Sequence, residues 1–114
     1  MANTFKNAIA KEVGTNPVDI YATSSNARST VIGINIANIS TSNIEVDILL
    51  RDDTSTETYV VKGCPVNRNS ALAAMGGDQK LVMQPNNVLI VRSNKDNSAD
   101  VIVSTLEITS WAII

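Results

Sequence analysis

Residues 44–51 read Ile-Glu-Val-Asp-Ile-Leu-Leu-Arg, and apolar and polar side chains alternate along most of this stretch. A period of two places successive side chains on opposite faces of a β-strand. One face would carry only apolar residues, and the other would carry Glu45, Asp47 and Arg51, which is typical of an antiparallel sheet with one solvated side. The stretch therefore predicts a β-sheet fold with a core on one side of the sheet.

The same pattern recurs on both sides of this stretch. Val, Ile and Thr supply 35 of the 114 residues and Leu only 6, and β-branched side chains favour strands. Clusters of Asn and Ser, which favour turns, separate the apolar runs. The predicted strands cover residues 18–21, 31–37, 44–51, 57–62, 71–75, 80–83, 88–93 and 101–109. About eight short strands at this spacing predict an all-β, antiparallel β-sandwich, jelly-roll-like or Ig-like.

Within these strands the pattern also predicts faces and breaks. Ile32, Ile34 and Ile36 should share one face of their strand, as should Ile102, Leu106 and Ile108 in the last one. Pro65 lacks an amide hydrogen, so residues 63–69 should interrupt the ladder. Hairpin turns are expected at residues 76–78 and 84–87, where Gly, Pro and Asn gather.

The two ends of the chain lie outside this period-two pattern. Phe5, Ile9 and Val13 recur at a spacing of four, which would line one side of a short helix ended by residues 14–17, or belong to a partly ordered arm. Residues 110–114 form an apolar tail, which either completes the edge of the core or docks on a neighbour. We therefore expect an N-terminal arm at 1–16, a sandwich domain at 17–109 and a tail at 110–114. The predicted interface residues are Phe5, Ile9, Val13, Trp111, Ile113 and Ile114.

Composition argues against several classes of function. The chain has no histidine, so it lacks the usual general base and the commonest metal ligand. Nine basic and eleven acidic residues give a net charge of −2, and no basic stripe marks a nucleic-acid binder. No apolar run approaches the roughly 20 residues of a membrane span. We therefore expect no nucleic-acid or membrane partner, and a protein made in a reducing compartment.

Three candidate sites of chemistry have ordinary structural interpretations. Cys64 is the one cysteine and has no histidine to activate it, so a structural cysteine is expected. Glu45, Asp47, Asp52 and Asp53 could offer oxygens to calcium but lack the spacing of a dedicated calcium loop. Residues 76–78, Gly-Gly-Asp, are followed by strand residues rather than by the helix of a phosphate-binding loop. The sequence predicts no cofactor, no metal and no catalytic residue, and hence no enzyme.

Several segments together resemble one family of proteins. They are residues 4–7, 13–15, 30–38, 59–66, 76–82 and 100–109. The most specific parts are Gly76-Gly77-Asp78-Gln79-Lys80 and Leu106-Glu107-Ile108-Thr109. In this order the chain is similar to a family of small virion structural proteins of tailed bacteriophages of the marine phage and cyanophage type. Members tend to end near Leu-Glu-Ile-Thr, whereas this chain continues for five residues, and many carry a small residue in place of Cys64. The resemblance implies a particle component without catalytic activity.

On this basis we expect a capsid decoration or cement protein that binds the head lattice as a small oligomer, with a trimer favoured. Its partners would be further copies of itself and the major capsid protein, and its place the virion, after synthesis in the host bacterial cytoplasm. A neck, tail or fibre-associated subunit is the main alternative. A host-surface or glycan-binding module is a third interpretation, for which Tyr21, Tyr59 and Trp111 are the available aromatic side chains.

Overall fold

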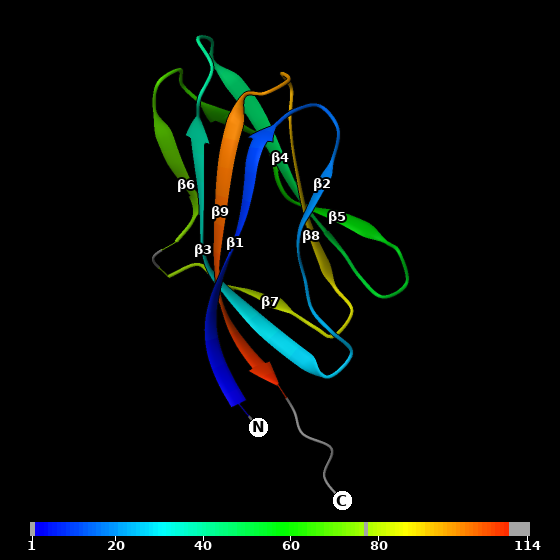
Figure 1. Cartoon of the computed structure of the whole chain (residues 1–114). Coiled ribbons are helices and arrows are strands. Elements are labelled where there is room, and N and C mark those ends of the chain that lie inside the picture. The colour runs from blue at the N-terminus through cyan, green and yellow to red at the C-terminus, as the bar shows by residue number, and fades with distance from the viewer. Residues whose placement is uncertain (1, 77, 110–114) are drawn as a thin grey trace, which may run out of the picture.

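The computed structural model describes residues 2–76 and 78–109, which form two antiparallel sheets packed face to face (Figure 1). The strands are β1 (Ala2–Val13), β2 (Val18–Ala22), β3 (Ala27–Asn38), β4 (Ile44–Arg51), β5 (Glu57–Val66), β6 (Ala71–Met75), β7 (Leu81–Met83), β8 (Val88–Ser93) and β9 (Ala99–Thr109). Sheet A has the order β1-β9-β3-β6, with β7 also paired to β3, and sheet B has the order β2-β8-β4-β5. The all-β sandwich predicted from the sequence is confirmed.

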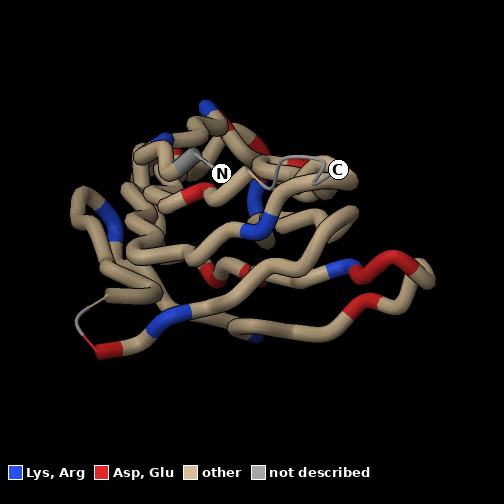
Figure 2. The backbone as a smooth tube through the Cα atoms, turned by 90° about the horizontal axis from the view of Figure 1, so that it is seen from below, with Lys and Arg blue, Asp and Glu red and all other residues tan. Residues whose placement is uncertain are grey.

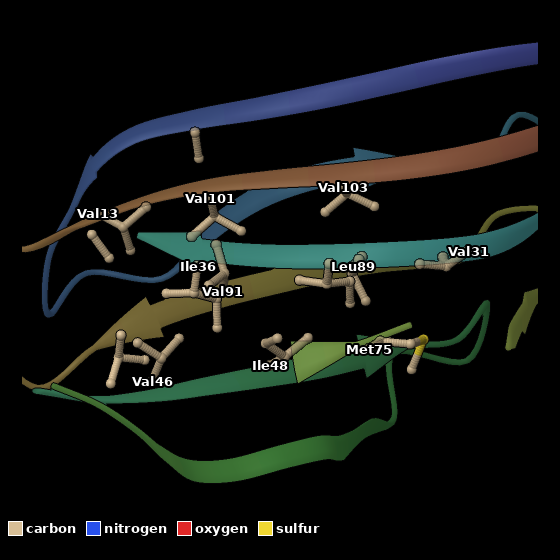
Figure 3. Packing of buried hydrophobic residues seen from close by; sticks show 14 of the residues in the cluster. Val13, Val31, Ile36, Val46, Ile48, Met75, Leu89, Val91, Val101 and Val103 are labelled. Carbon is tan, nitrogen blue, oxygen red and sulfur yellow. The ribbon is translucent and has the colours of Figure 1, made fainter. Parts of the chain in front are cut away.

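The core lies between the two sheets and consists mainly of β-branched side chains. Ile36, Val101 and Val103 of sheet A and Val46 and Leu89 of sheet B are all fully buried. Figure 3 shows these side chains pointing toward one another from facing strands. Such interdigitation of two inner faces is the expected source of stability in a sandwich.

The N-terminal segment differs from its prediction. Of the two interpretations of the spacing of Phe5, Ile9 and Val13, the short helix is wrong, because residues 2–13 form the edge strand of sheet A. This strand pairs with β9 from Ala2 opposite Thr109 to Val13 opposite Ala99, with a bulge after Ala10. A spacing of four is also a multiple of the strand period of two, so residues 5 and 9 share a face in either structure.

Bulges change which side chains enter the core. In β3 a register shift between Val31 and Gly33 leaves Ile32 as an extra residue, so Val31, Ile34 and Ile36 face inward and Ile32 does not. The predicted common face of Ile32, Ile34 and Ile36 is therefore wrong. In β9 the inward residues are Val101, Val103 and Thr105, while Ile102 lies on the outer face.

Three predicted breaks are also corrected. Strand β5 continues through Pro65, because β5 is an edge strand and an amide hydrogen is dispensable there. The segment around residues 76–78 is not a hairpin, since β6 and β7 both pair antiparallel to β3 and so follow one another along it. Residues 84–87 carry the chain from β7 in sheet A to β8 in sheet B.

Ile36 and Ile102 offer a test of which face of sheet A is buried. We expect Ile36→Ala to lower the free energy of unfolding by about 2 to 5 kcal/mol, because Ile36 is fully buried and its loss leaves a cavity. Ile102→Ala, in the adjacent strand but on the outer face, should cost less than about 1 kcal/mol. Urea unfolding followed by circular dichroism measures both changes, and equal losses would contradict the assigned faces.

Candidate interaction surfaces

A hydrogen-bonded network closes the end of the sandwich at which β9 ends. Glu107 of β9 accepts hydrogen bonds from Lys6 Nζ of β1 at 2.9 Å and from the Tyr21 hydroxyl of β2 at 2.8 Å. The Tyr21 hydroxyl is also hydrogen-bonded to Ser29 of β3. Because Tyr21 belongs to sheet B and its partners to sheet A, the network links the two sheets.

These contacts change the ionisation of the residues involved. The hydrogen bonds from Lys6 and Tyr21 hold the pKa of Glu107 below its ordinary value. Burial is the main cause of the raised pKa of Tyr21. The Tyr21 hydroxyl therefore stays protonated and can donate its hydrogen bond to Glu107. The network thus contributes stability as long as Glu107 is ionised.

The outer face of sheet B is covered by the protein's own polar side chains. Arg92 Nε of β8 donates to Asp47 Oδ2 of β4 at 3.0 Å, and Arg51 pairs with Asp19 at 3.2 Å. Between these two ion pairs, Leu49 and Ile90 lie opposite one another and are only 6% and 3% exposed. Long charged side chains commonly shield apolar residues on a sheet in this way. The face is therefore largely polar: Leu49 and Ile90 are covered, and Tyr59 of β5 is 42% exposed.

Asp47 also lines a shallow polar depression of about 420 Å³ on sheet B. Burial raises the pKa of Asp47, but hydrogen bonds from the Gly63 amide and from Arg92 outweigh it, so the net pKa is lowered. Gly63 lies in a β5 bulge with φ of 63°, a conformation that favours glycine. Glu45, Lys62 and Asn94 also line the depression. The depression therefore offers both hydrogen-bond donors and hydrogen-bond acceptors.

The aromatic side chains do not form a stacking platform in the described residues. The Tyr59 ring has the Lys62 ammonium 4.6 Å from its centroid, and Arg92 donates to its hydroxyl at 2.8 Å. Tyr21 lies on β2, at the opposite edge of sheet B from the β5 strand of Tyr59. Trp111 lies outside the described residues. A sugar ring would have to displace Lys62 to stack on that face of Tyr59.

The outer face of sheet A, called the A face below, is open and carries several exposed apolar side chains. Phe5 and Ile9 of β1, Val82 of β7 and Ile102 of β9 are 76%, 61%, 54% and 42% exposed. The register places Ile9 opposite Ile102. Leu106 lies between its two partners, Phe5 on β1 and Thr30 on β3. Thr30 also pairs with Val82 on β7. These side chains therefore share one surface.

The predicted interface residues are found in three situations. Phe5 and Ile9 lie on the A face, as exposed neighbours on β1. Val13 is 1% exposed and belongs to the protein's own core, because the bulge after Ala10 turns it inward. Trp111, Ile113 and Ile114 lie outside the described residues. The sequence interpretation missed Ile102 and Val82 as surface residues, because alternation alone does not tell which face of a strand is buried.

The residues considered for chemistry are in structural roles. Cys64 is buried in β5, and burial raises the pKa of its thiol. The Asp52 carboxylate accepts hydrogen bonds from the backbone amides of Thr54 and Thr56 within the loop before β5. In residues 2–76 and 78–109, no group of three or more His, Cys, Asp or Glu side chains is placed to hold a metal ion. Charged residues are spread around the backbone in Figure 2, and this described part has no helix able to cross a membrane.

Comparison with known proteins finds a shared fold. A scan against models of protein families matched none, and a search of curated proteins found no match. Two similar structures are a chain from the acid-stable capsid of Helicobacter pylori bacteriophage KHP30, with a TM-score of 0.58 at 14% identity, and a chain from the disulfide-linked pili of Bacillus endospore appendages, with a TM-score of 0.56 at 12% identity. Each likeness covers 96% of this chain, and 90% and 89% of the other. The likeness at this identity establishes a common fold, and both neighbours come from assemblies.

The Glu107 network makes stability depend on pH. A carboxylate with a lowered folded-state pKa contributes stability above its unfolded pKa, near 4.5, and loses that contribution as the pH falls through the folded value. We expect Glu107→Gln to lower the free energy of unfolding by about 1 kcal/mol at pH 7. The deficit relative to the unmodified protein should shrink toward pH 3.

Urea titrations at pH 7 and pH 3 measure this deficit. The control is Glu57→Gln, whose carboxylate lies 3.6 Å from Arg51 and whose side chain is 46% exposed. That change should have a smaller effect at both pH values. A Glu107→Gln deficit that stays the same between pH 7 and pH 3 would argue against an ionised Glu107 in the network.

Proposed function

We propose that this chain is a non-enzymatic structural subunit of a phage virion, made in the bacterial cytoplasm, and that it decorates the capsid as a small oligomer. The observation that carries the proposal is the open A face on a sandwich whose fold is shared with a chain of a phage capsid. An exposed apolar surface of this kind marks a contact site for another protein. Many modest contacts repeated over a lattice then give firm attachment.

The sequence supports the same class of function. The order of the segments that resemble small phage virion proteins runs through nearly the whole chain, including the Gly-Gly-Asp-Gln-Lys and Leu-Glu-Ile-Thr stretches. The capsid likeness also covers 96% of this chain and 90% of the other, so it extends over nearly the whole sandwich. A small domain with contact faces suits an accessory component of a particle.

A pilus subunit is supported less well by the chain's own chemistry. The similar chain of the endospore appendages comes from pili that are disulfide-linked. This sequence has one cysteine, and Cys64 is buried in β5 with a raised thiol pKa. A buried thiol with little thiolate character is poorly suited to bonding with another subunit. We therefore favour contacts through side-chain packing.

Two alternatives make different demands on the structure. A neck, tail or fibre-associated subunit would use the same kind of apolar contact, so the number of copies in the particle distinguishes it from a decoration protein. A glycan-binding module would need an accessible aromatic ring, and Lys62 lies over the ring of Tyr59. Binding to a glycan array that is lost in Tyr59→Ala would favour that third interpretation.

Quantitative mass spectrometry of purified virions tests the proposal. We expect this chain in hundreds of copies per particle, measured against the major capsid protein in the same sample. A dozen copies or fewer would favour the neck or tail alternative. Absence from purified virions, while the protein is present in the infected cell, would contradict a structural role in the particle.

A further inference from the structure

The A face is organised as a pattern that is nearly symmetric along the strands. Its central row is small and polar, with Asn7, Ser104 and Gly33 side by side on β1, β9 and β3. Along the strands, Phe5 and Leu106 lie two residues from this row on one side. Ile9 and Ile102 lie two residues from it on the other side. The face therefore has two apolar ridges separated by a shallow polar row.

Charge follows the same arrangement. Arg28 lies at one end of the face, opposite Ile108 of β9, and Asp100 lies at the other end of β9. Ile108, the partner of Arg28, and Asp100 are each four residues from Ser104 in β9, in opposite directions. The ion pairs of Lys6, Arg51 and Arg92 lie away from Arg28 and Asp100, in the Glu107 network or on sheet B. Arg28 thus places a positive charge at one end of the face, and Asp100 places a negative charge at the other end, where Lys11 and Glu12 also lie.

We infer that a second copy of this chain packs its A face against this one, about a two-fold axis that runs along the row of Asn7, Ser104 and Gly33. Such an axis reverses the strand direction in the second copy. It places the ridge of Phe5 and Leu106 over the ridge of Ile9 and Ile102, and the Arg28 end over the Asp100 end. An isologous contact requires self-complementarity of this kind.

The size of the face is adequate for such a contact. Strands β1 and β3 have 12 residues each and β9 has 11, while β6 and β7, with five and three residues, share the fourth position. At about 4.8 Å between strands and about 3.3 Å per residue, the face has a projected area of about 680 Å². Accessible area exceeds projected area, because side chains stand out from the sheet. The face therefore approaches the roughly 800 Å² per partner of a standard protein interface.

This inference rests on the proposed function, since contact between copies is what an assembling subunit needs, and it names the surface used. Two-fold packing predicts a dimer, whereas the sequence interpretation favoured a trimer. Association between copies is measured on the purified protein in solution. Presence in the virion is measured on purified particles. The two proposals can therefore fail separately.

Sedimentation equilibrium of the full chain at micromolar concentrations is the first test. We expect a dimer, and we expect Ile102→Lys to raise its dissociation constant by at least about 100-fold, because a charge would be buried at the centre of an apolar contact. The matched control is Tyr59→Lys, on β5 of sheet B, at a residue that is 42% exposed, as Ile102 is. It should leave the dimer unchanged, and circular dichroism should show the same fold in both variants.

Charge reversal tests the axis itself. Arg28→Glu and Asp100→Lys should each weaken the dimer, and the double variant should recover most of the affinity, because the two-fold arrangement places Arg28 over Ala37 of the second copy, which is paired with Asp100 on the adjacent strand. A monomer, a trimer, a dimer unaffected by Ile102→Lys, or no recovery in the double variant would overturn the inference. A monomer that binds undecorated capsids, and loses this binding in Ile102→Lys, would assign the A face to the capsid instead.

Discussion

The pairing of β9 with both β1 and β3 is the interaction on which the rest of the structure depends. Residues 99–109 lie between the first strand and the third, so Thr109 is opposite both Ala2 and Ala27. Figure 1 shows the start of β1 and the end of β9 at the same end of the sandwich as a result. Sheet A is complete only when β9 is inserted, and this contact joins residues about as far apart in sequence as the chain allows. Such long-range pairing is expected to make folding slow relative to proteins with local contacts.

The register of β9 also determines what the surface looks like. Because Val101 and Val103 face the core, Ile102 and Leu106 must face outward together with the residues of β1 and β3 that oppose them. A shift by one residue would bury Ile102 and expose the valines. The apolar A face is therefore a direct consequence of the register that builds the core. The two sheets differ in what covers their outer faces, since ion pairs flank Leu49 and Ile90 on sheet B.

Much of the fold could be predicted from the sequence, because period-two alternation in segments such as 44–51 has one simple interpretation. The errors come from places where local pattern is ambiguous. The spacing of Phe5 and Ile9 fits both a helix and a strand, and pairing with a strand a hundred residues away decides between them. The bulge at Ile32 is likewise set by the partner strand. Phe5 and Ile9 were predicted as interface residues because they are apolar and lie outside the predicted core, and both are exposed. Ile102 and Val82 could be recognised as surface residues only from the register.

The edges of the two sheets explain why a face, rather than an edge, should make the contact between copies. An open edge strand invites pairing with another chain, and proteins commonly prevent it with bulges, charges, proline or short strands. Edge strand β1 has a bulge after Ala10 and the inward-pointing Lys6. Strand β5 has Pro65 and two bulges, while β2, β6 and β7 are five residues or fewer. Each edge of the described sheets thus carries a feature that opposes strand addition, but no such feature covers Phe5, Ile9 and Ile102. The surface left free to associate is the A face, where side chains rather than backbone groups meet the partner.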